Sequence, residues 1–431
     1  MAEQQVVTVR RGISLGVGSM VGAGIFALLG ESAAMAGSAV WLMFLAAGVI
    51  ALLTGYSFVQ LGIRYPTRGG VVEYLVRAYG SGTFSGGCSI LFYIAQLIGV
   101  AMISLAFGKY AAKLIGITEN LAVWERVLAS TLVITLAALN LAGSQLLRHV
   151  QKIIVIANLT ILGAFAVALS TFVQAPNLSV STWPDASPIL GSLALTFFAF
   201  TGFAVISNTA DRMKDPAKDL PRAMFGTISI VIVLYVALAV GVIGTVDSQT
   251  LTSSGPMLLV EAARTAFGPI ALKLLLISAV ISTITCINGG LFGITNITFT
   301  LAEKGQLPSR FQEQLRASTH GLSISVVIAL VMINFLTLTT VASLGSATSL
   351  LVYSLVNFGA LRLIQGSLVK RTLISLSVIA CVFAITIWVI YTLRSSPSSL
   401  GIFAFFLIAS FVAETLLQRI KGRRITADTG V

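Results

Sequence analysis

The residues best suited to bind a small molecule form a glycine-rich stretch, 16–30, inside an apolar segment near the N-terminus. Glycine costs a helix about 1 kcal/mol relative to alanine, and a broken helix survives in a bilayer only where its backbone faces a cavity or other protein. Two half-helices meeting at residues 22–24 would present free N–H groups and a helix N-terminus to a carboxylate. Close helix packing through the small residues Gly18, Gly22 and Ala23 is the alternative.

A second glycine in the middle of an apolar segment is Gly202, in the aromatic-rich stretch 196–205. Interrupted segments at corresponding positions of two inverted halves are the best sequence pointer to a transporter binding site. The two stretches run in opposite directions if the N-terminus is inside, as an inverted repeat requires. Phe-rich helices also commonly face lipid, but the pair together favours a site at two breaks near the membrane midplane.

The composition places these stretches in a membrane protein. The chain has 431 residues, of which 56% are hydrophobic and 10% charged, and its mean hydropathy is +0.97. Soluble domains carry roughly a quarter charged residues, so the sequence predicts an all-α protein that crosses the membrane many times. Residues 1–9 are too short and too polar for a cleavable signal peptide, so the first apolar segment is expected to remain as a membrane helix.

Enzyme, cofactor and metal chemistry find no support in the sequence. Cys88, Cys286 and Cys381 each lie in an apolar run, whereas His149 and His320 lie beside basic residues or at segment ends. There is no Cys/His cluster and no Walker-type phosphate loop. An intramembrane enzyme would need paired acidic or histidine residues at depth, so we expect no enzymatic activity, no cofactor and no metal site.

A membrane-spanning helix needs roughly 20 apolar residues, and twelve segments qualify. They are 12–36, 40–63, 84–108, 127–147, 153–172, 188–210, 223–246, 272–302, two within 321–360 divided near 339–343, 372–392 and 400–416.

The distribution of Lys and Arg sets the orientation. With the N-terminus inside, this division leaves six of the 27 basic residues outside and puts the other 21 inside, as the positive-inside rule requires. The net charge of +12 is then a property of the cytoplasmic face rather than a nucleic-acid surface. We therefore expect a multi-pass protein of the plasma membrane with both termini cytoplasmic.

Four motifs, in order along residues 9–308, resemble those of the amino acid–polyamine–organocation (APC) transporters, whereas the last four segments match in hydropathy only. The motifs are Val21-Gly22-Ala23-Gly24-Ile25-Phe26, Tyr65-Pro66-x-x-Gly69-Gly70-x-x-x-Tyr74, Phe198-x-Phe200-x-Gly202-Phe203 and Asp215-Pro216-x-Lys218-Asp219-Leu220-Pro221-Arg222.

The resemblance implies a LeuT-type fold with two inverted repeats of five helices and discontinuous helices 1 and 6. The repeats would cover residues 1–172 and 173–366, with helices 11 and 12 and a cytoplasmic tail in 367–431.

The resemblance also implies a substrate site. The substrate carboxylate would meet backbone amides at the first break, its ammonium would meet backbone carbonyls at both breaks, and Phe198 or Phe203 would cover it. The implied amides are those of Gly22, Ala23 and Gly24, and the implied carbonyls are those of Met20, Val21, Phe200 and Thr201. The other implied substrate-binding residues are Ile25, Gly202 and Ala204.

Two departures from the family pattern bear on substrate and coupling. Many relatives carry a carboxylate at the position of Ala204, so a dibasic or polyamine substrate is disfavoured. Some proton-coupled relatives carry a lysine at the position of Asn158, whose amide cannot titrate. Asn158 fits equally well as an ordinary hydrogen bond between helices.

A coupling ion has a candidate site near the first break. Ser282 and Thr285 share a helix face, and their hydroxyls could join the carbonyls of Gly18 and Val21 around Na⁺, with Asn158 beside them. Hydroxyls bonded back to their own helix are the commoner arrangement. The ionisable residues noted in the segments, Glu31, Asp211 and Glu303, lie at segment ends, so no proton carrier is evident in the core, and Na⁺ is the favoured ion over H⁺ if any is used.

The sequence thus predicts a permease that moves small neutral amino acids across the membrane by alternating access. A polyamine or organic cation exchanger of the same superfamily and a non-transporting amino acid sensor are the alternatives.

Overall fold

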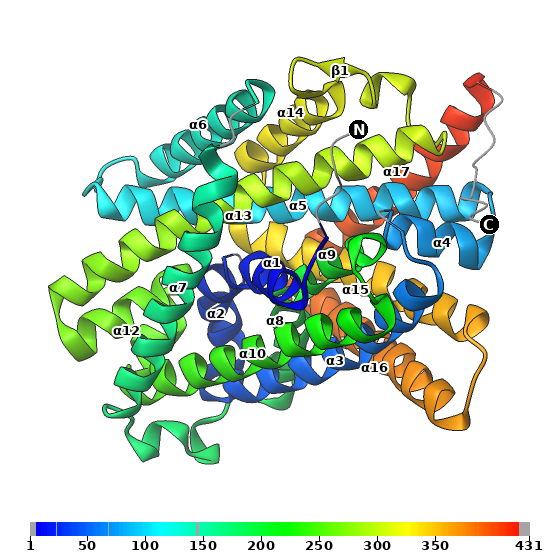
Figure 1. Ribbon diagram of the computed structural model, residues 1–431. Helices are drawn as coiled ribbons and strands as arrows, with labels where there is room; N and C mark the ends of the chain where they lie inside the picture. The colour runs from blue at the N-terminus through cyan, green and yellow to red at the C-terminus, as the bar shows by residue number, and fades with distance from the viewer. Residues whose placement is uncertain (1–5, 23, 68, 144–145, 422–431) are drawn as a thin grey trace.

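The computed structural model of the protein describes residues 6–22, 24–67, 69–143 and 146–421, and these ranges form a bundle of helices (Figure 1). Ala23, the side chain of His149 and both chain ends lie outside the described parts. The α-helices of the described chain are α1 (Val9–Val21), α2 (Gly24–Ala36), α3 (Val40–Arg64), α4 (Val71–Tyr79), α5 (Thr83–Leu114), α6 (Leu121–Leu141), α7 (Leu146–Ser170), α8 (Ala186–Phe198), α9 (Ala204–Ser207), α10 (Pro216–Thr245), α11 (Ser248–Ser253), α12 (Leu258–Phe267), α13 (Pro269–Glu303), α14 (His320–Phe335), α15 (Leu338–Leu363), α16 (Leu368–Ser395) and α17 (Pro397–Lys421).

Short elements connect these helices. A two-residue hairpin between α13 and α14 pairs β1 (Gln314–Leu315) with β2 (Ser318–Thr319) in antiparallel register. The 3₁₀ helices are η1 (Gly37–Ala39), η2 (Ala175–Leu178), η3 (Val180–Thr182), η4 (Thr201–Phe203), η5 (Ala210–Arg212), η6 (Gly255–Met257) and η7 (Ser309–Phe311).

Ten helical stretches among the described residues are long and apolar enough to cross a membrane. One of them, Gly24–Arg64, is 41 residues long and holds both α2 and α3, and α14 is a further apolar helix of 16 residues. The prediction of an all-helical, multi-pass membrane protein is therefore confirmed. The count of twelve crossings and the two five-helix repeats remain predictions.

Helix α5 lies at the centre of the bundle (Figure 1). The most apolar stretch of α5 is 83% buried, whereas the corresponding stretches of α6 and α17 are 22% and 17% buried. A helix that is apolar on all sides is expected inside a bundle or in a membrane, and α5 carries no charge between Phe84 and Gly108. The outer helices α6 and α17 turn most of their apolar surface outward.

Both helix interruptions expected from the glycines are present. Helix α1 ends at Val21, Gly22 forms a turn, and α2 begins at Gly24. Helix α8 ends at Phe198, a turn follows at residues 199–200, and η4 leads into α9. The first half of each pair therefore stops in the interior of the bundle.

Several helix boundaries differ from those expected. The run 321–360 divides at residues 336–337, not near 339–343, because Leu336 is extended and the Thr337 side chain caps α15 by accepting a hydrogen bond from the Thr340 amide at 3.2 Å. The fourth segment was expected at 127–147, but α6 ends at Leu141 and α7 already begins at Leu146. The expected range 127–147 therefore extended past the turn between these two helices.

Helix α4 was not expected at all. It follows the predicted turn and starts after Gly70, whose φ of +49° an L side chain rarely adopts. Its apolar residues face the core, and Glu73 is completely buried. At nine residues it is too short to span a membrane, which is why a search for long apolar runs missed it.

Candidate functional site

The two helix breaks lie against each other. A Cβ atom added to Gly202 would stand 2.9 Å from both the carbonyl oxygen of Ser19 and the amide nitrogen of Met20. Real Cβ atoms do not approach backbone this closely, so only glycine allows this contact between η4 and α1. The close approach of the Ser19–Met20 backbone therefore explains why residue 202 is a glycine.

Tyr235 of α10 joins the two breaks. Its hydroxyl lies 2.8 Å from the carbonyl oxygen of Met20 and 3.4 Å from that of Ala199, one from each break. A carbonyl at the end of a helix has no partner within that helix, so this hydroxyl supplies one inside the protein. Its ring also packs on Phe200, with the ring centroids 5.2 Å apart.

Tyr353 of α15 plays a similar part at the second break. Its hydroxyl donates a hydrogen bond of 2.8 Å to the carbonyl oxygen of Thr201, and the Thr201 hydroxyl donates one of 2.8 Å to Phe198. Sequence reasoning missed both Tyr235 and Tyr353. Each is the tyrosine of its predicted segment, and a buried tyrosine hydroxyl usually has a partner, but the sequence does not reveal which partner.

The carbonyls expected to meet an ammonium group already take part in hydrogen bonds. Met20 and Thr201 accept from the two tyrosines, and Phe200 accepts from the amide of Phe203 at 3.2 Å. A carbonyl oxygen has two lone pairs, so each retains capacity for a second donor. Val21, the last residue of α1, is 2% exposed.

The amides expected to meet a carboxylate lie in tightly packed surroundings. Gly22 and Gly24 are buried, and Ala23 lies outside the described residues. A Cβ on Gly22 would stand 2.8 Å from that of Cys286, and one on Gly24 would stand 2.7 Å from the carbonyl oxygen of Ala199. Ile25, next along α2, is completely buried.

The two aromatic candidates occupy different places. Phe203 is completely buried and packs edge-on against Phe58 of α3, with centroids 5.4 Å apart, and beside Tyr353 at 5.5 Å. Phe198 is 8% exposed and lies against Gly345 of α15. Ala204 is 7% exposed at the start of α9. The side chains of Phe198, Phe203 and Ala204 are therefore all buried, whereas Thr201 and Gly202 between them are half-buried.

The five residues proposed for a coupling ion line one small cavity of about 10 Å³ between α1, α7 and α13. This volume is about that needed for one water molecule. These residues are Gly18, Val21, Asn158, Ser282 and Thr285.

Hydrogen bonds already engage the polar groups of this cavity. The Asn158 amide nitrogen donates to Ser282 at 2.9 Å, and its amide oxygen accepts from Ser278 at 2.7 Å. The Thr285 hydroxyl bonds back to Ile281 of its own helix at 2.9 Å. Asn158 therefore links α7 to α13, and Thr285 adopts the common back-bonded arrangement.

Two buried carboxylates, Glu73 and Glu414, were not anticipated from the sequence. Glu73 is completely buried and lies 2.6 Å from Arg77 and 2.5 Å from Lys304, which is itself 4% exposed. Glu414 of α17 is 1% exposed and accepts a hydrogen bond of 2.7 Å from Gln418. Glu414 ends an apolar run, which could have revealed it, whereas Glu73 lies in the overlooked α4.

The Asp215–Arg222 motif opens α10 outside the predicted membrane span. Asp215 precedes the helix, Pro216 occupies its first position, and Lys218 lies 3.1 Å from the Asp215 carboxylate. A hydrogen bond from Lys218 holds the pKa of Asp215 below its usual value. This motif therefore begins a helix.

Comparison with known proteins agrees with this architecture. The family model described as amino acid permease matches residues 10–416. The inner membrane transport protein YbaT of Escherichia coli is 32% identical over 87% of this chain and 89% of its own length. An uncharacterized protein of Methanocaldococcus jannaschii is 29% identical over 97% and 95%, and the serine/threonine exchanger SteT of Bacillus subtilis is 28% identical over 74% of each chain. The chain belongs to the amino acid permease family.

Proposed function

We propose that this protein is a secondary transporter that carries small neutral amino acids across the membrane by alternating access. The observation that carries the proposal is the contact between two interrupted helices, where Gly202 meets the backbone at Ser19–Met20 and Tyr235 reaches both breaks. The N-terminus of α2 favours a carboxylate, and the carbonyls at the ends of α1 and α8 favour an ammonium group. A zwitterionic amino acid presents both groups.

The packing on one side of the breaks supports alternating access. The hydroxyl of Tyr110 lies 2.5 Å from the carbonyl oxygen of Phe26 in α2 and 2.7 Å from that of Pro256 in η6. Glu31, further along α2, accepts a hydrogen bond of 2.9 Å from Thr339 of α15. These contacts hold α2 against α5, η6 and α15. We propose that their release opens the site on the side of the breaks where α2 lies.

A neutral substrate fits the residues at the breaks. Ala204 offers no second carboxylate, and the buried carboxylates Glu73 and Glu414 belong to α4 and α17. The name of SteT, a serine/threonine exchanger, supports the same substrate class. We further propose two inverted repeats, 1–172 and 173–366, in a plasma membrane protein with both termini cytoplasmic.

Uptake into proteoliposomes tests the proposed function. We expect labelled serine, threonine or alanine to accumulate, and unlabelled neutral amino acids to compete better than arginine or putrescine. The same neutral amino acids should raise the melting temperature of the purified protein, since a ligand that binds only the folded state stabilises it. Binding without uptake would identify a sensor, and preferential competition by putrescine would identify a cation exchanger.

Ion coupling gives a second test, because Asn158 cannot carry a proton. We expect that an inward proton gradient does not stimulate uptake, and that any ion dependence is on Na⁺. Asn158→Ala removes the bonds to Ser278 and Ser282 and should lower uptake less than tenfold, since two such bonds at about 0.6 kcal/mol each in a membrane total less than the ~1.4 kcal/mol of a tenfold change. Strong proton stimulation in both proteins, without a response to Na⁺, would contradict this.

A further inference from the structure

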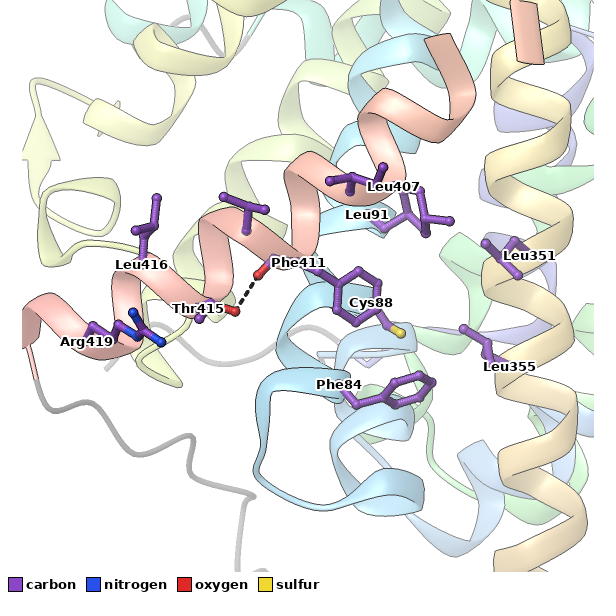
Figure 2. Close-up of a pocket in the computed structure, with 12 residues that line it drawn as sticks. Phe84, Cys88, Leu91, Leu351, Leu355, Leu407, Phe411, Thr415, Leu416 and Arg419 are labelled. Atoms are coloured by element: carbon purple, nitrogen blue, oxygen red, sulfur yellow. Dashed lines mark hydrogen bonds between the residues drawn. The ribbon is translucent and has the colours of Figure 1, made fainter. Parts of the chain in front are cut away.

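A groove lies away from the two breaks, between α5, α15 and α17 (Figure 2). Its volume is about 650 Å³, within the roughly 300–1,000 Å³ range of small-molecule sites. Its floor is Cys88 and Leu91 of α5, both almost completely buried. Leu351 and Leu355 of α15 form one wall, and α17 forms the other.

The rim of the groove faces outward. Phe84, Ile408, Val412 and Leu416 all line it and are 45%, 62%, 49% and 52% exposed. The family comparison and the apolar helices place this protein in a bilayer. Among the ten candidate membrane spans, α17 has the least buried apolar stretch. The groove therefore opens to lipid rather than to water.

The ends of the groove differ in polarity. Figure 2 shows Arg419 and Thr415 at one end, where α17 approaches its C-terminus, and Leu407 towards the other. Arg419 is the charged member among the described lining residues, and it is exposed. The Thr415 hydroxyl is bonded to the Phe411 carbonyl of its own helix at 2.8 Å. An apolar channel with one cationic end complements a molecule that has a long apolar tail and an anionic head.

Close packing of α17 on α5 borders the groove. Helix α17 lies close on α5 at Gly86 and Gly87, where an added Cβ would meet Glu414 and Phe411. Gln418 ties the same end of α17 to α5, because its amide accepts a hydrogen bond of 3.0 Å from Thr83. The space between α17 and α15 is thus bounded by a fixed contact, not by a loosely attached helix.

We propose that this groove binds an anionic glycerophospholipid, with an acyl chain along the apolar floor and the phosphate at Arg419. Burial of an acyl chain adds about 0.8 kcal/mol per methylene relative to water, but the bilayer already removes it from water. Selection must therefore come from the net charge of the head group: arginine pairs well with phosphate, and in a zwitterionic lipid the attached cation offsets that attraction. The Lys/Arg distribution puts Arg419 at the predicted cytoplasmic surface, where anionic lipids are recognised by basic pockets between helices.

Native mass spectrometry of the full-length protein in mild detergent tests the site, with dioleoyl phosphatidylglycerol and dioleoyl phosphatidylcholine added separately. We expect the protein to retain phosphatidylglycerol about fivefold more strongly, the effect of one basic residue near a membrane surface. Arg419→Gln should remove this preference and leave retention of phosphatidylcholine unchanged. Arg371→Gln, which neutralises an exposed arginine on α16 outside the groove lining, is the matched control and should behave as wild type.

A second variant fills the groove without touching the charge. Ile408 is 62% exposed, so Ile408→Trp should fold normally, occupy the channel and lower retention of both lipids. An undiminished preference in Arg419→Gln, or an equal loss in Arg371→Gln, would overturn the proposal. A dimer that Ile408→Trp dissociates, with lipid retention unchanged, would assign the groove to a second copy of the chain and also overturn it.

Discussion

Gly24→Val is expected to abolish uptake of amino acids, with a loss of at least about 100-fold, while the protein still reaches the membrane. A Cβ at this position meets the hydroxyl of Tyr235 and stands 2.7 Å from the Ala199 carbonyl oxygen, so one of the two breaks must shift. A displacement of about 1 Å at a positioned site costs on the order of 100-fold in rate. Valine adds two further methyl groups where α2 begins.

The control for this variant is Gly293→Val. Gly293 lies in α13 and has no atom within 4 Å of an added Cβ, so the substitution tests the general effect of valine for glycine in a membrane helix. We expect uptake within about twofold of wild type, because a β-branched residue costs a helix interior less than about 1 kcal/mol. Wild-type uptake by Gly24→Val would show that the substrate binds away from the break.

The two breaks were predictable because they violate a local rule. A run of glycines is unfavourable in a helix, and an apolar stretch that keeps them at Gly22, Gly24 and Gly202 must gain something from its surroundings. The structure identifies that gain as close contact, since Gly202 meets the backbone of Ser19 and Met20. The pattern therefore located the two helix breaks, although not the side chains that join them.

The tyrosines that complete the site could not be predicted in this way. Tyr235 follows Met20 by 215 positions in the chain, and Tyr353 follows Thr201 by 152. A tyrosine in an apolar run is also typical of membrane interfaces. Its role depends on which carbonyl its hydroxyl reaches, and that is decided by how α10 and α15 pack in the folded bundle.

The burial of the charged residues Lys304 and Glu73 could not be predicted for a related reason. Lys304 follows a long apolar helix and would ordinarily be solvated at the membrane surface. It is almost fully buried, and Glu73 of α4 lies 2.5 Å from it. Helix α4 is short and amphipathic, so neither its presence nor its partner follows from the search for membrane spans.

Glu73→Ala is expected to lower the free energy of unfolding by about 3–5 kcal/mol, the cost of removing one partner from a buried ion pair. The carboxylate is completely buried and lies between Arg77 at 2.6 Å and Lys304 at 2.5 Å. Its removal leaves two positive charges close together, one of them almost fully buried. Urea unfolding in mild detergent, followed by tryptophan fluorescence, measures the change.

An exposed pair provides the control. Arg264 lies 2.5 Å from Glu261 with 61% of its side chain exposed, and Glu261→Ala should cost at most about 1 kcal/mol, as surface ion pairs do. The double variant Glu73→Leu with Lys304→Met should recover most of the stability lost in Glu73→Ala, because apolar side chains of similar size often replace a buried ion pair at little cost. If Glu73→Ala unfolds no more readily than Glu261→Ala, the ion pairs of Glu73 do not contribute the expected stability.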